Sequence, residues 1–309
     1  MQALFDFFGW TFAQRAAATG LDKIISQLFS FRLDMRQITA SLVLIAELLS
    51  CMLLKTPITP YGEPLDLVGY ELVFEDNFDA NELNTELWSH RAEGERRIGY
   101  NNRSQIRVHD GSLFIYGEYL EDGAYGEGFY AAMLCTNELF CKGYFEISCK
   151  CNSGTDFWSA FWLQSRGINP YDHEQSNGGI YAAELDIMES SNANLILKSH
   201  KNSITSNIHC NGVDDAPELI DSLRLGSFKG NNIYEEFNTY GLKWTDTEYI
   251  FYVNGVESCR TSFGKGVCQN PLELIISLEL PAAVSKKMTS DPNYKTFMEV
   301  DYVRIYQAE

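Results

Sequence analysis

The sequence predicts an all-β protein in which one antiparallel sandwich spans residues 66–309. Three observations lead to this fold class. Short segments of alternating apolar and polar residues follow one another from Tyr70, and no long helix-like segment separates them. The pairs Asp110-Gly111 and Asn254-Gly255 stand between alternating runs, where tight hairpin turns are expected. Strands joined without intervening helices favour antiparallel sheets.

Individual segments justify the prediction strand by strand. In "PLELIISLEL", leucine or isoleucine occupies every second position from Leu272 to Leu280, so one face of this strand is expected in the core. In "TDFWSAFWLQS", Trp158, Trp162 and Gln164 share one face, and the opposite face is apolar. Strands are expected within residues 70–78, 105–120, 143–151, 157–165, 204–210, 248–258, 272–280 and 298–307.

Residues 1–55 differ from the sandwich because their apolar residues have helix-compatible spacing. Arg36 precedes an apolar run at 38–54 that Glu47 interrupts, which is typical of a signal peptide read from Met35. A membrane anchor or a helical extension packed on the body are the alternatives. We therefore expect a secreted or cell-surface protein, with a cytoplasmic location as the alternative. Residues 56–65 contain three prolines and predict a linker.

The charge of the chain excludes some classes of partner. The formal net charge is −18, and all of the acid surplus lies after residue 55. Such a body repels nucleic acid and anionic membranes, so membrane contact is expected only through the N-terminal apolar segment. The eight cysteines form no CxxC pair and are expected to be mainly buried thiols. We expect a monomer whose partner is a neutral or cationic ligand.

The segment "AELDIMES" carries three carboxylates, one of them out of phase. Regular alternation places Glu184 and Asp186 on one face and Glu189 on the apolar face, where an unpaired charge is costly. A β-bulge near Met188 would return Glu189 to the face of the other two acids. The alternative is a solvated strand end that loses its register after Ile187.

Three acids in one row suit the hydrolysis of glycosidic bonds with retention of configuration. One ionised carboxylate attacks the anomeric carbon, and a second, protonated one donates to the leaving oxygen. On a flat strand Glu184 and Glu189 lie roughly 13 Å apart, whereas retaining carboxyl groups lie about 5–5.5 Å apart. The hypothesis therefore requires a curved sheet with a concave cleft.

Side chains of neighbouring segments suit sugar binding. Trp158 and Trp162 present aromatic rings for stacking on sugar faces, with core packing as the alternative. Asn207 and His209 share a face and offer an amide and an imidazole to sugar hydroxyl groups.

Taken in chain order, these segments resemble glycoside hydrolase family 16, the jelly-roll enzymes that include laminarinases and lichenases. The resemblance rests on "LVFEDNFD", "GYFEISCK…FWSAFWLQ", "AELDIMES", "YGLKWTDTEYIFYVNGVE" and "MEVDYVRIYQ". It implies a β-jelly roll with a concave cleft, in which Glu184 is the nucleophile, Glu189 the acid/base and Asp186 the residue that assists the nucleophile. The chemistry requires no cofactor.

The resemblance also implies a substrate and a metal. The negative body favours a neutral β-1,3- or mixed-linkage β-glucan over a sulfated galactan. His209-Cys210-Asn211-Gly212 replaces the usual H-W-D-G segment, which leaves substrate preference open. The family's structural calcium site maps to Asn77, Gly111 and Asp301, although Asn77 stands where an acid is usual. The alternatives to an endo-acting β-glucanase are a non-catalytic carbohydrate-binding jelly roll, a transglycosylase, or a β-galactan hydrolase of the same family.

Overall fold

The computed structural model describes residues 57–153, 156–165, 178–180, 182–190, 202–210, 221–264, 266–284 and 293–309. The predictions for residues 1–55 fall outside these ranges. Within them no helix is both long and apolar enough to cross a membrane.

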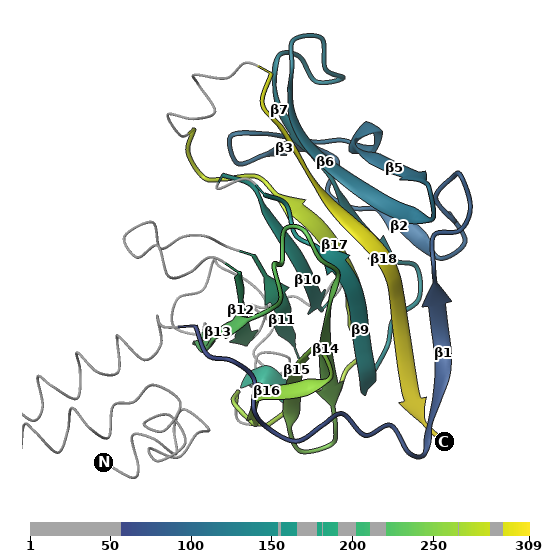
Figure 1. Ribbon diagram of the computed structural model, residues 1–309, viewed down its shortest axis with the longest axis vertical. Coiled ribbons are helices and arrows are strands. Elements are labelled where there is room, and N and C mark those ends of the chain that lie inside the picture. The colour runs from purple at the N-terminus through teal and green to yellow at the C-terminus, as the bar shows by residue number, and fades with distance from the viewer. Residues whose placement is uncertain are drawn as a thin grey trace, which may run out of the picture.

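Two sheets face each other and form the predicted sandwich (Figure 1). The smaller sheet has seven strands, in the order β13 (Asp221–Lys229), β12 (Ser203–Cys210), β11 (Ala183–Glu189), β10 (Trp158–Gln164), β17 (Glu273–Glu279), β8 (Met133–Thr136) and β2 (Trp88–His90). The larger sheet has eleven strands. Nine follow the order β16 (Val256–Thr261), β15 (Tyr249–Val253), β14 (Asn238–Trp244), β9 (Gly143–Lys150), β18 (Lys295–Ala308), β6 (Ser112–Leu120), β7 (Gly128–Ala131), β4 (Gly99–Asn101) and β3 (Gly94–Arg96). The remaining two are β1 (Tyr70–Asp76), which pairs with β18, and β5 (Ile106–His109), which pairs with β6.

Among the described residues, the helical content is two single 3₁₀ turns, η1 (Arg103–Gln105) and η2 (Gly178–Ile180). All strand pairs are antiparallel except β4 with β7. The two predicted hairpins are confirmed. Asp110-Gly111 joins β5 to β6, Asn254-Gly255 joins β15 to β16, and all four turn residues have positive φ.

The core lies between the sheets and follows the predicted alternation. The inward face of β17 buries Leu274, Ile276 and Leu278, while Glu273, Ser277 and Glu279 point to the other side with the cleft. On β10, Phe161 and Leu163 are fully buried in the core, and the opposite face belongs to a second, smaller apolar cluster that includes Trp162. Trp244 is fully buried and ends β14. The face of the smaller sheet that points away from the core therefore carries the site.

The sequence did not predict β14, which lies between β15 and β9 in the larger sheet. The other strands that it did not predict are short or lie at sheet edges. They are β2, β3, β4, β7, β8 and β13. Several have only three or four residues, too few for an alternating pattern to stand out.

The described part of the predicted linker, residues 57–65, is hydrogen-bonded to the sandwich. Ile58 is buried and exchanges backbone hydrogen bonds with β13 at Ser227 and Lys229. Pro64 then bridges to Val256 on β16. This segment therefore contacts an edge strand of each sheet (Figure 1).

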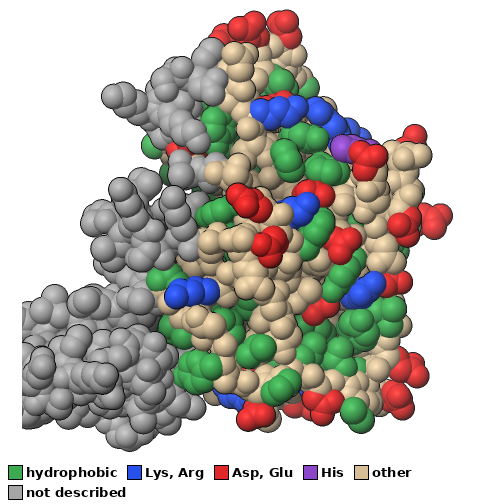
Figure 2. Space-filling model, in the orientation of Figure 1, with side chains coloured by type: hydrophobic (Ala, Val, Ile, Leu, Met, Phe, Trp, Pro, Cys, Tyr) green, Lys and Arg blue, Asp and Glu red, His purple; other side chains and the backbone are tan. Residues whose placement is uncertain are grey.

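Acidic side chains are spread over the face shown in Figure 2, with fewer lysines and arginines among them. This distribution agrees with the net charge of −18. The cysteines of the described residues are free thiols, and all but Cys141 are buried, as expected.

Candidate active site

The predicted bulge is present in β11. Against β10, Trp162 pairs with Asp186 and Phe161 pairs with Met188, so Ile187 is the extra residue. The register with β12 shifts in the same place, between Asp186 and Glu189. Ile187 and Met188 are both buried in the core, which is the local result of the bulge. Glu189 therefore returns to the face of Glu184 and Asp186.

All three acids line one open cleft whose empty volume is about 300 Å³. Its other lining residues are Arg96, Arg97, Trp158, Ala160, Trp162 and Glu279. The concave cleft predicted from the sequence is thus formed by β10, β11 and β17, with the turn at 96–97 on one side.

Glu189 is partly buried and accepts two hydrogen bonds from neighbouring strands. Trp158 Nε1 donates to one carboxylate oxygen at 3.0 Å, and Asn207 Nδ2 donates to the other at 2.5 Å. Burial raises the pKa of Glu189 above its ordinary value, the Glu279 charge raises it further, and the two donors only partly oppose this. A carboxyl group with a raised pKa is suited to hold a proton for donation.

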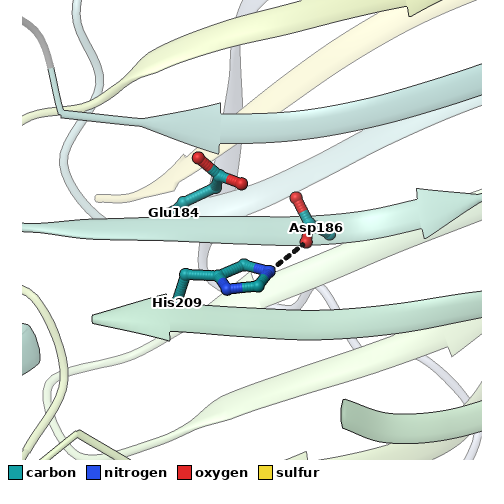
Figure 3. Close-up of side chains that lie close together, drawn as sticks. All are labelled: Glu184, Asp186 and His209. Carbon is teal, nitrogen blue, oxygen red and sulfur yellow. Dashed lines mark ion pairs between the residues drawn. The ribbon is translucent and has the colours of Figure 1, made fainter. Parts of the chain in front are cut away.

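Asp186 and His209 form a pair on adjacent strands. His209 Nε2 lies 3.3 Å from Asp186 Oδ2 (Figure 3). On its other side, His209 Nδ1 lies 2.7 Å from the Ser222 hydroxyl. Burial raises the pKa of Asp186 to about 8, with the charges of Glu189 and Glu184 adding to the effect. The hydrogen bond to Asp186 raises the pKa of His209 to about 9. Because the raised pKa of His209 depends on the negative charge of Asp186, the pair holds one proton at neutral pH that an isolated imidazole would mostly have lost, and this proton lies on His209.

Glu184 projects from β11 on the same side as Asp186 (Figure 3). Its carboxylate accepts a hydrogen bond of 2.5 Å from the side-chain amide of Gln164, the residue opposite it on β10. The ligand atoms of Glu184, Asp186 and His209 lie within 4.8 Å of one another, close enough to hold a cation. The contact between His209 and Asp186 accounts for most of this grouping.

Of the predicted sugar-binding residues, Trp158 and Trp162 line the cleft, whereas Asn207 and His209 contact its acids. The Trp158 ring is covered by the Arg97 guanidinium at 4.6 Å, and Trp162 Nε1 donates to Ser277 at 3.1 Å. Asn207 and His209 contact Glu189 and Asp186 respectively. The polar groups of Asn207 and His209 thus position the acids, and direct contact with sugar stays a prediction.

The sequence analysis missed the charged residues around the acids. Arg96 and Arg97 both donate to Glu279 Oε2, at 2.8 and 2.9 Å. Arg91 contacts Glu273 and Gln164, on the same face of the sheet. The positions of Glu273 and Glu279 could have been predicted from the sequence, because both residues alternate with the apolar residues of β17 that face the core. The positions of the arginines could not, because they lie in three-residue strands and turns without periodicity.

The residues predicted to bind calcium already have other partners. Asn77 Oδ1 accepts from the Arg304 guanidinium at 3.2 Å, and Asp301 accepts from the Ser148 hydroxyl at 3.1 Å. Gly111 lies in the β5–β6 turn at φ +74°. A guanidinium beside Asn77 opposes a second cation there, so this set fits calcium poorly. The calcium site stays a prediction, to be tested by metal removal.

Comparisons with known proteins bear on the family and the fold of this chain. Residues 72–308 match the family model described as "Beta-porphyranase A-D, GH16 domain". A "Beta-glucanase" from Rhodothermus marinus is 24% identical over 262 residues, which cover 77% of this chain and 85% of the relative. The chain spans 35% of the length of two endo-1,3-1,4-beta-glycanases from Rhizobium meliloti, each 23% identical to it.

Solved structures share the fold. Porphyranase B from Zobellia galactanivorans has a TM-score of 0.63 at 22% identity, covering 82% of this chain and 100% of its own. A non-specific endo-β-1,3(4)-glucanase of family GH16, crystallised with an oligosaccharide at its active site, has a TM-score of 0.61 at 21% identity, covering 81% and 99%. The jelly roll predicted from the sequence is confirmed.

Proposed function

Starting from the fact that this chain belongs to glycoside hydrolase family 16 and is therefore a hydrolase of β-linked glycans, we propose that it is an endo-acting retaining β-glucanase. Glu184 serves as the nucleophile, Glu189 as the acid/base, and Asp186 as the residue that assists the nucleophile. The observation that carries the proposal is the bulge at Ile187, which brings all three acids to one cleft.

The reaction proceeds in two displacements. A Glu184 carboxylate oxygen bonds to the anomeric carbon while the glycosidic C–O bond breaks, and Glu189 gives its proton to the leaving oxygen. Glu189, now ionised, takes a proton from water, whose oxygen attacks the anomeric carbon and releases Glu184. Asp186 pairs with His209 at 3.3 Å, and the positive charge of His209 limits the net negative charge beside Glu184.

The first experiment replaces each glutamate by glutamine, a change of nearly equal volume. Glu184→Gln and Glu189→Gln are assayed for reducing ends released from laminarin and lichenan, and Glu95→Gln on an exposed position serves as a control. We expect both cleft variants to lose nearly all activity and the control to keep it. Full activity in either cleft variant would contradict the assignment.

The charges of the cleft support a neutral substrate. Four acids and two arginines line it, and both arginines are already paired with Glu279. A sulfated chain would call for unpaired cations at this surface. We therefore propose β-1,3- or mixed-linkage β-glucan as the substrate.

A sulfated or neutral β-galactan is the second candidate, favoured by two specific observations. The matched family model and one structural neighbour are named for porphyranases. In addition, Arg96 lines the cleft, and its Nε has no hydrogen-bond partner among the described residues. Adding porphyran and agarose to the panel separates the candidates. Arg96→Gln should impair hydrolysis of a sulfated chain and leave hydrolysis of laminarin nearly unchanged.

Product analysis on the same panel tests the remaining alternatives. Products longer than the supplied oligosaccharide would indicate transglycosylation. Binding without release of reducing ends would indicate a carbohydrate-binding jelly roll.

A further inference from the structure

A row of three polar side chains crosses three adjacent strands next to the candidate nucleophile. On β10, Gln164 pairs with Glu184 of β11 on one side and with Glu273 of β17 on the other. One amide therefore lies between two carboxylates, and Glu273 is only 3% exposed.

Arg91, which follows β2, joins this row from the side. Its Nε donates to Glu273 Oε1 at 2.9 Å, and its terminal nitrogen donates to the side-chain oxygen of Gln164. The guanidinium also lies 5.2 Å from the centre of the Trp162 ring. The backbone N–H of Arg91 donates to the backbone carbonyl of Met133 at 2.9 Å. Arg91 is thus held by several neighbours and is not a freely moving surface side chain.

The chemistry of the two side chains fixes the direction in which Gln164 points. A guanidinium has only donors, so the atom of Gln164 that faces Arg91 must be the oxygen. The NH₂ group of Gln164 must then face the opposite way, toward Glu184, where it donates at 2.5 Å. Without Arg91 the same amide could turn over and donate to Glu273, because a carboxylate lies on each side.

Arg91 also removes the competing acceptor. Its charge and its N–H group satisfy the buried Glu273 carboxylate, which would otherwise attract the amide of Gln164. Arg91, which contacts both Glu273 and Gln164, therefore decides which of the two acids receives the amide donor.

We propose that Arg91 and Glu273 are positioning residues that act through Gln164 on Glu184. They hold the Gln164 amide so that it fixes one oxygen of the Glu184 carboxylate and leaves the other to attack the anomeric carbon. The proposal rests on the assignment of Glu184 as the nucleophile, and neither Arg91 nor Glu273 is required to touch the sugar.

The test is a double-mutant cycle on the full chain with Arg91→Met, Gln164→Leu and the double variant. The assay measures kcat and KM on the polysaccharide cleaved by the wild type. We expect each single variant to lose roughly ten- to a hundredfold in kcat, the effect of one hydrogen bond to a charged group, with little change in KM. Because both residues act through one contact, the double variant should be no slower than Gln164→Leu.

Two additional variants guard against effects on folding. Arg91→Met leaves Glu273 buried without its cation, so Arg91→Met/Glu273→Gln is made alongside it to remove that charge. This pair should show the same loss in kcat, because nothing then fixes the direction of Gln164. Arg103→Met removes an exposed arginine that pairs with Glu93, and it should keep full activity.

Each outcome has one meaning. Full kcat in Arg91→Met or in Gln164→Leu, or losses that multiply in the double variant, would overturn the positioning role. These results are distinct from a failure of the proposed function. That failure would appear as activity in Glu184→Gln, whereas an inactive Glu184→Gln together with an active Gln164→Leu would overturn the positioning role alone.

Discussion

Replacing Trp158 by phenylalanine tests whether Glu189 is the acid/base. The indole N–H of Trp158 donates to Glu189 at 3.0 Å, and phenylalanine keeps an aromatic ring beneath Arg97 but removes this donor. The hydrogen bond favours the ionised form of Glu189, so its loss makes the carboxyl group harder to deprotonate.

The size of the effect follows from the contacts of Glu189. A hydrogen bond to a charged acceptor contributes about 1.5–3 kcal/mol, and 1.36 kcal/mol corresponds to one pH unit. The lower end applies because Asn207 still donates to the other oxygen at 2.5 Å. The catalytic acid must be protonated, so we expect the alkaline limb of the kcat/KM profile to move up by about one pH unit.

The assay is a pH–rate profile on the identified polysaccharide, with Trp162→Phe as the matched control. Trp162 lies on the same face of β10, but its N–H donates to Ser277 rather than to an acid. Its replacement should leave the alkaline limb in place. An unmoved or lowered limb in Trp158→Phe, or an equal shift in both variants, would refute the reasoning.

Three further predictions concern Glu279, His209 and the predicted calcium site. Glu279→Gln removes a negative charge that raises the pKa of Glu189, so the alkaline limb should move down, opposite to Trp158→Phe. The folded-state pKa of His209, about 9, lies above its ordinary 6.5, so its contribution to stability is full below pH 6.5 and lost toward pH 9. His209→Gln should therefore flatten the fall in melting temperature between pH 6.5 and 9, and an equally steep fall would contradict the pairing. If calcium binds at Asn77 and Asp301, EDTA should lower the melting temperature and calcium restore it. Identical melting curves with EDTA and with calcium would contradict calcium binding at these residues.

Much of the fold could be predicted because a strand with one buried face alternates apolar and polar residues along the sequence. On β17 the leucines must meet the core at every second position, and this requirement also placed Glu273 and Glu279 on the opposite face. The short strands could not be predicted, since β3 and β4 have three residues each and their pairing depends on distant partners.

The acids of the site could be predicted for a physical reason. A charge in the wrong phase of an apolar strand has to be explained by an irregular backbone, and the bulge at Ile187 is that irregularity. The surrounding cations could not be predicted. Arg91 and Arg97 lie in loops, and their positions depend on tertiary contacts with Glu273 and Glu279 that no local pattern encodes.

The segment at 58–65 has a practical consequence for anyone who produces this protein. It covers the exposed backbone of β13 at Ile58 and of β16 at Pro64, the outermost strands of the two sheets. Uncovered edge strands invite pairing with other chains and aggregation. A recombinant version trimmed to begin at β1 would expose both edges at once. Expression should therefore start upstream of Ile58, even though the regular strands begin only at Tyr70.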